Sequence, residues 1–193
     1  MMAPTRIVLA ATGASGLPYA VSLARTLASD PAIELHLIVS EAAKKVLALE
    51  SDLPLSSLTS LAHACYGQSD LDAGPASGSW RHGGMVVCPC SMASLAAIAH
   101  GLGTNLIHRA ADVTLKEGRR LVLVPRESPL SEIHLKNMLA ARQAGAVILP
   151  PCPGFYHRPT SIDDLVDFVV ARVLSALGIE QQLVAGWKEE ETS

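Results

Sequence analysis

Small and hydroxyl-bearing residues follow the first apolar segment of the chain, where they could bind an anion. Residues 7–11 are apolar, and residues 12–16 (TGASG) come directly after them, before a segment with helical periodicity. The N–H groups at the beginning of a helix lack partners within the helix and lie at the positive end of its dipole, so they favour phosphate and other anions. The glycine spacing is not that of dinucleotide sites, which favours a mononucleotide or a flavin. A tight turn between a strand and a helix is the alternative.

Basic residues are concentrated in one later part of the chain. Five of the 15 Lys and Arg residues are found there: Arg109, Lys116, Arg119, Arg120 and Arg126. Arg126 and Glu127 directly follow an apolar segment at 121–124 that favours a strand. A cation and a carboxylate at the end of such a strand could bind an anion and transfer a proton. A solvated helix face is the alternative for several of these residues.

Three further patterns favour structural over catalytic roles. The sequence CPC at 88–90 lacks the two-residue spacer of redox and zinc motifs, so we expect buried cysteines at the end of a strand. Asp163, Asp164 and Asp167 match the D-D-x-x-D pattern that all-helical isoprenyl diphosphate synthases use for magnesium. They fall in the first turns of an expected helix, where acidic residues complement the dipole. Since the seven histidines also show no ligand spacing, we expect no metal site.

The elements that position these residues alternate between strands and helices. Continuously apolar segments indicate strands buried on both faces, at 7–11, 33–39, 85–88, 121–124 and 147–149. Helical patterns follow at 15–27, 40–50, from 91 onward, and at 106–118, 131–143 and 161–178. This alternation predicts an α/β fold with a doubly wound, Rossmann- or flavodoxin-like parallel sheet in a three-layer αβα arrangement. Ligands of such sheets bind beyond the carboxyl ends of the strands. We expect a long surface loop at 66–83.

Length and composition limit the class of protein. The 193 residues favour one domain, at 1–180, followed by a C-terminal tail at 181–193. With 49% hydrophobic and 17% charged residues, we expect a large core and an oligomer interface.

The net charge of −3 gives no overall attraction to nucleic acid or to an anionic membrane. No apolar run reaches the roughly 20 residues that span a bilayer, and there is no signal-peptide core, so we expect a cytoplasmic protein with reduced thiols.

Seven short motifs occur in the order and at the spacing of one protein family. They are TGASG at 12–16, VSEAA at 39–43, ASGS at 76–79, CPCS at 88–91, RAADV at 109–113, LVPRE at 123–127 and PGFYH at 153–157. Together they cover nearly the whole chain, which resembles the UbiX-type flavin prenyltransferases of the flavoprotein superfamily. The resemblance implies metal-independent transfer of a dimethylallyl group from dimethylallyl monophosphate to N5 and C6 of reduced FMN. The product, prenylated FMN, would serve a UbiD-type decarboxylase. The resemblance also implies a large homo-oligomer, commonly a dodecamer, with active sites between subunits.

The resemblance also implies a role for individual residues. The FMN contacts would be Gly13, Ala14, Ser15, Ser40, Ser91, Met92, Ala93, Ser94 and Arg126. The contacts to the substrate phosphate would be Arg109, Lys116, Tyr156 and Arg172. We expect Tyr156 or Arg172 to reach a flavin bound mainly by another protomer. Ser15, Glu50 and Glu127 would be catalytic, with the proton acceptor left open among Ser15 with Glu50, Glu127 and the departing phosphate. Trp80 and Trp187 are candidates for an aromatic wall around the developing allyl cation, with an ordinary packing role as the alternative for each.

Two other functions stay open. The chain could be an FMN-binding accessory subunit of an aromatic-acid decarboxylase complex, although such a subunit has no use for a second phosphate site. It could also be a flavin-dependent decarboxylase of peptidyl-cysteine substrates, but these carry a P-x-M-N-x-x-M segment where this chain has PRESP at 125–129. Two departures from the family pattern occur, namely Gly118 and Arg120 within a segment that many relatives read as KERRP, and Ala20 in place of a glycine.

Overall fold

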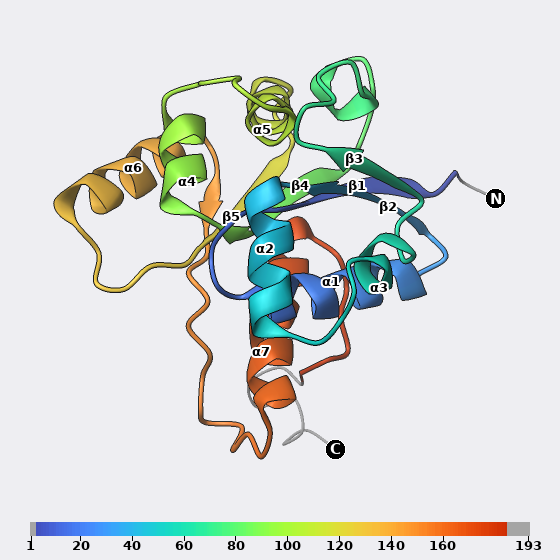
Figure 1. The fold of residues 1–193 in the computed structure, drawn as a ribbon, viewed down its shortest axis with the longest axis vertical. Helices are drawn as coiled ribbons and strands as arrows, with labels where there is room; N and C mark the ends of the chain where they lie inside the picture. Colours follow the sequence, from blue (N-terminus) through green and yellow to red (C-terminus); the bar gives the residue numbers. More distant parts are fainter. Residues whose placement is uncertain (1–2, 185–193) are drawn as a thin grey trace.

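Six parallel strands form the sheet around which the chain is built (Figure 1). The computed structural model describes residues 3–184. The strands are β1 (Thr5–Ala11), β2 (Ile33–Val39), β3 (Ala64–Gly67), β4 (Gly84–Cys90), β5 (Arg120–Pro125) and β6 (Val147–Ile148). Their order is β3-β2-β1-β4-β5-β6, and every neighbouring pair is parallel. The strand order reverses between β1 and β4, which is the switch point where ligands of doubly wound sheets bind. The predicted fold class is confirmed.

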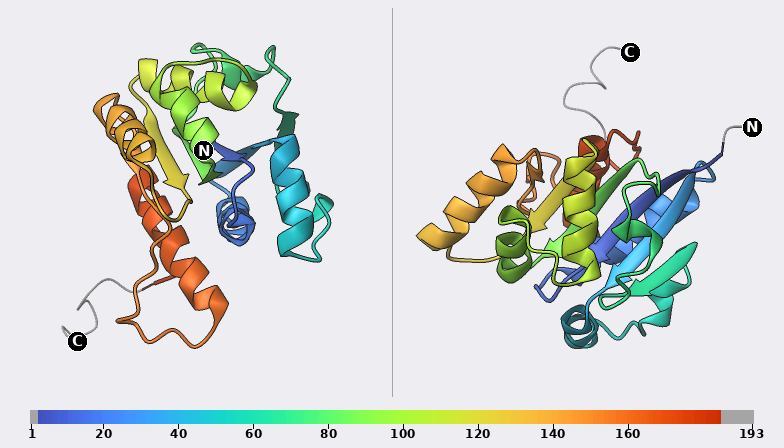
Figure 2. Two further views of the ribbon diagram at one scale, coloured as in Figure 1. Left: turned by 60° about the vertical axis from the view of Figure 1, so that its left-hand side comes forward. Right: turned by 90° about the horizontal axis from the view of Figure 1, so that it is seen from above.

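Helices cover both faces of the sheet (Figure 2). They are α1 (Leu17–Ser29), α2 (Glu41–Glu50), α3 (Ser56–Thr59), α4 (Met92–Ala99), α5 (Leu106–Lys116), α6 (Glu132–Gln143) and α7 (Ile162–Leu177), with a 3₁₀ turn, η1, at Gly74–Ala76. Helices α1, α2 and α7 pack on one face, and α4 and α5 pack on the other. Helix α6 lies at the sheet edge beside α4. No helix within residues 3–184 is long and apolar enough to cross a membrane.

Alternate residues of each central strand enter two separate cores. In β1, Leu9 packs with α1 and α7, whereas Val8 and Ala10 pack with α4 and α5. Both sets are fully buried. This two-sided burial explains why the central strands read as continuous apolar segments in the sequence.

Strand β3 and helix α3 differ from the sequence expectation. Residues 64–67 pair with His36–Val39 at the edge of the sheet, although residues 66 and 67 were expected within a loop. Most of β3 is only half buried, so it carries no continuous apolar run. Helix α3 has four residues, too few to show a helical period. The remaining boundaries agree with the expected ones within a few residues.

The acidic pattern at the start of α7 serves as a helix cap, as expected. The Ser161 hydroxyl accepts a hydrogen bond from Asp164 N, and the Asp164 carboxylate accepts from Ser161 N at 3.1 Å and from Thr160 N at 2.6 Å. These hydrogen bonds, led by that from Thr160, lower the pKa of Asp164 to about 2. The helix ends at Gly178, which adopts a left-handed conformation with φ 74°. Cys88 and Cys90 are buried and free, also as expected.

Candidate active site at the carboxyl ends of the strands

Thr12 joins the ends of β1 and β4 at the switch point. Its Oγ1 donates to the carbonyl oxygen of Pro89 at 2.8 Å and accepts from Ser91 N at 2.7 Å. Its backbone N–H donates to the same carbonyl at 3.2 Å. Since Thr12 is 2% exposed, these hydrogen bonds fix the position of one strand end relative to the other. Thr12 was not among the expected site residues, and its place directly after an apolar strand was the only sequence signal for this role.

The N-terminus of α1 already holds an anion, the carboxylate of Glu50. Gly16 N donates to both Glu50 oxygens at 3.0 Å, and Leu17 N donates to one of them at 2.9 Å. Glu50 is the last residue of α2, which therefore lies beside the loop at residues 12–16. From the sequence we expected these N–H groups to bind a phosphate or another anion. In the structure the anion is the carboxylate of Glu50, which belongs to the same chain. A bound phosphate would need donors elsewhere.

Two more helix N-termini lie at the carboxyl ends of the neighbouring strands. Ser40 follows β2, and its hydroxyl accepts from Ala43 N at 3.0 Å. Ser91 follows β4; its hydroxyl accepts from Ser94 N at 3.3 Å and donates to Ser94 Oγ at 3.2 Å. The other N–H groups in these first turns have no partner within the helix. The ends of β2 and β4 therefore offer positive potential and hydroxyl groups, a donor set that fits the phosphate and ring of a flavin mononucleotide.

Gly13 allows the loop at residues 12–16 to touch the first turn of α2. A Cβ at Gly13 would collide with Cβ of Ala42. Any larger residue would push the two segments apart and widen the space between the ends of β1 and β2. The structure therefore gives Gly13 a packing role at the site. Ala14 is buried and Ser15 is half buried beside it.

A buried histidine of α5 contacts the first turn of α4. His108 Nε2 lies 3.4 Å from Ser94 Oγ, and His108 Nδ1 lies 2.9 Å from Thr104 Oγ1. Burial lowers the pKa of His108, which keeps the imidazole neutral at pH 7. The sequence did not distinguish His108 from the other six histidines. Its only signal was its position in the first turn of α5.

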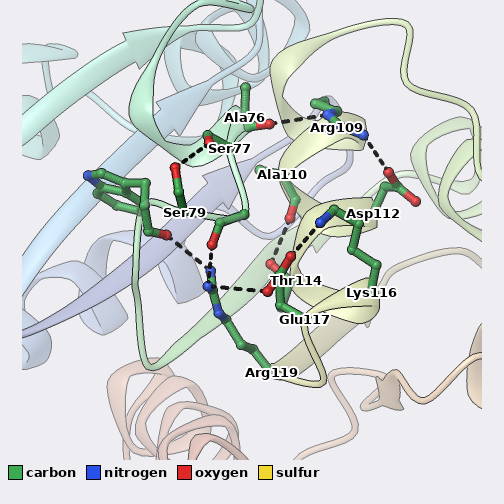
Figure 3. A network of polar contacts seen from close by, with 12 residues as sticks. Ala76, Ser77, Ser79, Arg109, Ala110, Asp112, Thr114, Lys116, Glu117 and Arg119 are labelled. Atoms are coloured by element: carbon green, nitrogen blue, oxygen red, sulfur yellow. Dashed lines mark hydrogen bonds and ion pairs between the residues drawn. The ribbon is translucent and has the colours of Figure 1, made fainter.

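Arg109 and Arg119 hold the loop at residues 76–80, and Lys116 lies beside it near Gly78 (Figure 3). We call these three basic residues the α5 basic cluster. Arg109 Nε donates to the carbonyl oxygen of Ala76 at 3.2 Å, and Arg119 donates to the carbonyl oxygen of Gly78 at 2.7 Å. Arg109 also pairs with Asp112 at 2.8 Å, and Lys116 pairs with Glu117. The hydrogen bond from Lys116 lowers the pKa of Glu117. The cluster thus has positive charge that two carboxylates only partly neutralise.

Arg126 and Glu127 lie far from most of this cluster within the same chain. Lys116 stands a few residues before β5, and Arg126 directly follows the end of β5, which at six residues is about 20 Å long. Both Arg126 and Glu127 are exposed, and Glu127 Oε1 accepts from Ser128 N at 3.0 Å. Arg126 N donates to the carbonyl oxygen of Cys90 at 3.2 Å, which ties its backbone to the end of β4. Arg126 therefore lies at the carboxyl ends of the strands, whereas Lys116 does not.

Tyr156 and Arg172 form a third group on another surface. The Tyr156 ring stands edge-on to Phe168 with centroids 5.7 Å apart, and Phe168 lies one turn before Arg172 on α7. Arg172 and Phe168 line a groove of about 490 Å³ between β6 and α7, together with Cys152. Tyr156 is 59% exposed. One chain thus does not gather the four expected phosphate ligands into one site.

Trp80, one of the two tryptophans given as candidates for an aromatic wall, lies away from the carboxyl ends of the strands. Trp80 packs edge-on against His36, 4.7 Å between centroids, and Arg6 lies 5.0 Å above its ring. These partners belong to β1 and β2 and lie away from the carboxyl ends. Trp80 therefore packs within its own chain, the alternative that the sequence left open for it. Trp187 lies outside the described residues.

Comparisons with known proteins agree with this architecture. The flavoprotein family model matches residues 1–174. The flavin prenyltransferase UbiX of Pseudomonas aeruginosa is 50% identical over 204 aligned residues, which cover 98% of this chain and 97% of the relative. A solved structure described as a dodecameric FMN-dependent UbiX-like decarboxylase from Escherichia coli O157:H7 has a TM-score of 0.93 at 45% identity, covering 95% of this chain and all of that one.

A second solved structure carries ligands. AnUbiX (PadA1), in complex with FMN and dimethylallyl pyrophosphate, has a TM-score of 0.88 at 44% identity and covers 96% of this chain and all of that one. Identities of this size over nearly the full length exceed what a shared fold alone requires. The chain therefore belongs to the flavoprotein family and, within it, to the UbiX-type flavin prenyltransferases.

Proposed function

We propose that the protein transfers a dimethylallyl group from dimethylallyl monophosphate to N5 and C6 of reduced FMN. The observation that carries this proposal is the set of hydroxyl groups and helix N-termini at the carboxyl ends of β1, β2 and β4, where Glu50 holds the N-terminus of α1. It occurs in a chain that is 50% identical to the Pseudomonas aeruginosa enzyme over 98% of its length. An accessory FMN-binding subunit is the second candidate. The retained α5 basic cluster argues against it, because a flavin carrier needs no second phosphate site.

The flavin is proposed to bind at the ends of β1, β2, β4 and β5. The residues in contact would be Gly13, Ala14, Ser15, Ser40, Ser91, Met92, Ala93, Ser94 and Arg126. Because Glu50 takes the N–H groups of α1, the flavin phosphate is proposed to bind the first turns of α2 and α4. When bound, reduced flavin supplies the electron-rich N5 and C6 atoms. Thr12 keeps the surrounding strand ends in register.

Cations are proposed to hold the phosphate of the prenyl donor and to stabilise it as it leaves. These are Arg109, Lys116 and Arg172, with the Tyr156 hydroxyl as a further donor. A departing phosphate carries about −1.5 to −2 charges at neutral pH, so positive side chains replace the metal that other prenyl transfers use. The proton released when the second bond forms is proposed to pass to Glu50 through Ser15, to Glu127 or to the phosphate. Glu50 and Glu127 therefore fill the proposed base positions.

The separation of these groups within one chain supports a site completed by neighbouring copies. Lys116 and Arg126 lie at opposite ends of β5, so one chain cannot place both on the same phosphate. We propose a homo-oligomer, a dodecamer like the one described for the Escherichia coli relative. The flavin-binding domain would span residues 1–180 and the tail residues 181–193. A cytoplasmic location and delivery of the product to a UbiD-type decarboxylase complete the proposal.

The test is anaerobic incubation with reduced FMN and the prenyl donor, without added metal, followed by the mass of the extracted flavin. A flavin heavier by one five-carbon unit is expected for the wild-type protein. Lys116→Ala and Arg126→Ala should abolish the product. The control variant Arg25→Ala removes the same charge from the outer side of α1 and should leave the product unchanged. Monophosphate and diphosphate donors run in parallel identify the preferred leaving group.

An unmodified flavin in every reaction would overturn the transferase proposal. If FMN nevertheless remains bound to the purified protein, the accessory role is the better description. FMN affinity, measured by quenching of its fluorescence, separates the two outcomes.

A further inference from the structure

Helix α6 turns its small and polar residues toward its own chain and its leucines toward solvent. Asn137 and Ala141 are the buried residues of this helix, and Met138 is partly buried against the core beside them. Asn137 Oδ1 lies 3.2 Å from Nε2 of His100, the residue that caps α4. Leu135 and Leu139 are 52% and 59% exposed. A helix that packs only on its own core normally shows the reverse pattern.

This orientation leaves α6 poorly supported by its own chain. A helix of 12 residues is marginal in water without packing against something else. Helix α6 lies at the edge of the molecule beside α4, and both views in Figure 2 leave its outer side clear of the described chain. Burying one leucine contributes about 1.5–3 kcal/mol. A surface that covers Leu135 and Leu139 would therefore add stabilisation that a single chain lacks.

The exposed leucines lie on a face of α6 that has an acidic residue at one end and a basic residue at the other. Glu132, Leu135, Leu139 and Arg142 lie within about 80° of one another on a helix with 3.6 residues per turn. We call these four residues the α6 seam. Along the helix axis the two leucines lie at equal distances on either side of the level of Asn137, and the two charged residues lie at equal distances farther out. An acidic group at one end and a basic group at the other make this face complementary to itself when one copy is reversed.

We propose that the α6 seam binds the α6 seam of a second copy of this chain across a two-fold axis. The two helices run antiparallel, so Leu135 packs against Leu139 of the partner subunit. Glu132 pairs with Arg142 of the partner subunit. A two-fold axis produces each of these contacts twice, as in other interfaces built from one surface patch. Glu132 also pairs with Lys136 in its own chain, but both side chains are more than 70% exposed, so this contact is weak.

A second copy fits this face better than an unrelated protein because both halves of the charge complementarity are present in one sequence. The inference rests on the homo-oligomer of the proposed function and names one of its contact surfaces. The dodecamer described for the Escherichia coli relative agrees with assembly through contacts between identical chains.

Charge reversal tests the pairing in the full-length protein. Glu132→Arg and Arg142→Glu each place like charges opposite one another twice per contact. Each single variant should raise the dissociation constant of the assembly at least 10-fold, seen in sedimentation velocity as a shift to smaller particles. The double variant exchanges the two charges and should restore the wild-type mass. Single variants with the wild-type mass, or a double variant as dissociated as the singles, would overturn the pairing.

Disulfide trapping tests the register of the two helices. Chains with Leu135→Cys and Leu139→Cys, each in a background with Cys65→Ser and Cys152→Ser, are co-expressed with different tags and oxidised. The expected product is a dimer containing one chain of each kind. Ile133→Cys is the control, because Ile133 is 68% exposed but lies on the far side of the helix. Two results would contradict the proposal. One is cross-linking of Ile133→Cys at the same yield, and the other is the absence of a cross-link between Leu135→Cys and Leu139→Cys.

Failure of the seam can be separated from failure of the proposed function. The mass and cross-linking measurements need neither flavin nor prenyl donor. A wild-type protein that assembles through the seam but produces no prenylated flavin would overturn the function and leave the seam intact. A charge-reversed variant with normal circular dichroism, wild-type mass and wild-type product would overturn the seam and leave the function intact.

Discussion

The two ends of the parallel sheet use polar residues in opposite ways. At the carboxyl ends, Thr12, Glu50 and Ser91 bind backbone groups of loops and first turns, next to further donors that the helices leave without internal partners. Toward the amino ends, His36 and His82 are packed among aromatic rings with their polar atoms largely occupied by the chain itself. Donors remain for a ligand at the carboxyl ends, which we call the open end. At the other end, called here the closed end, the polar side chains pair mainly within the chain, beside a groove of about 420 Å³ that Arg6, Glu34 and His82 line.

Partners at the closed end come from several strands. His36 Nδ1 lies 3.0 Å from the hydroxyl of Tyr66, and the His36 ring meets Trp80 edge-on. His82 Nδ1 donates to the carbonyl oxygen of Gly84 at 3.1 Å. Burial lowers the pKa of both histidines, and that of His82 falls to about 4. Both rings are therefore neutral at pH 7.

The difference follows from the direction of the chain. In a parallel sheet with crossover helices, the helix N-termini gather at the carboxyl ends of the strands, where their N–H groups attract anions. The helix C-termini gather at the other end and offer carbonyl oxygens. Polar side chains at the carboxyl ends can therefore work with the backbone to hold phosphate. Polar side chains at the amino ends need partners from their own chain. We therefore expect them to affect the stability of the fold.

Glu50→Gln should have the largest effect of any change at the open end. The amide keeps the size of the side chain but removes the charge on the N-terminus of α1 and the proposed proton acceptor. We expect the rate of flavin prenylation to fall about 100- to 10,000-fold, the range for loss of a general acid or base. The control is Glu34→Gln, at the amino end of β2, where the carboxylate pairs with Arg6 at 3.1 Å. A wild-type rate for Glu50→Gln would show that Glu50 only caps helix α1 and takes no part in proton transfer.

The sequence predicted the open end better than the closed one. Ser40 and Ser91 could be placed because short motifs follow strands that are buried on both faces, whereas Glu50 was expected near the flavin only from the family resemblance. The occupant of the α1 N-terminus could not be predicted, since Glu50 reaches it from the far end of another helix. Nor could the separation of Lys116 from Arg126 be read from their closeness in sequence. A helix followed by a strand reverses direction, so residues ten positions apart end up at opposite ends of the sheet.

The closed end was missed for a related reason. Strand β3 is a half-buried edge strand and lacks an apolar run, so the environment of His36 could not be assembled from the sequence. Trp80 was expected near the reacting groups, and only the pairing of β2 with β3 shows what surrounds its ring. Long-range partners of this kind leave no local pattern.

The buried imidazole of His82 should make stability depend on pH. An unperturbed histidine takes up its proton near pH 6.5, whereas His82 in the fold does so only near pH 4. Between these values the unfolded chain binds more protons, so the free energy of unfolding falls as the pH falls from about 6.5 to about 4. At about 1.4 kcal/mol per pH unit, His82 contributes a loss of about 3 kcal/mol. Urea unfolding at a series of pH values measures it.

His82→Gln should flatten this pH dependence without abolishing it. Burial also lowers the pKa of His36 and His108, and these two residues would retain part of the slope. An unchanged slope in His82→Gln would show that the closed end does not control acid stability.

Thr12→Val should affect stability and ligand binding together. Valine fills the same space but cannot donate to Pro89 or accept from Ser91 N, which leaves a buried N–H without its partner. We expect a loss of about 2 kcal/mol in the free energy of unfolding and weaker FMN binding. Thr26→Val, which removes only a hydroxyl bonded to the carbonyl oxygen of Ser22 within α1, is the control. Unchanged FMN affinity in a destabilised Thr12→Val protein would remove Thr12 from the site.

Tyr66→Phe should give the smallest effect, and one confined to stability. The change removes the hydroxyl 3.0 Å from His36 Nδ1, while His36 Nε2 already has no hydrogen-bond partner among the described residues. We expect the free energy of unfolding to fall by about 1 kcal/mol, the contribution of one hydrogen bond. FMN affinity and prenylation rate should stay at wild-type values, because the hydroxyl contacts His36 and none of the residues proposed to bind FMN. A change in either would mean that the two ends of the sheet are coupled through β2, whose residues connect His36 to Ser40.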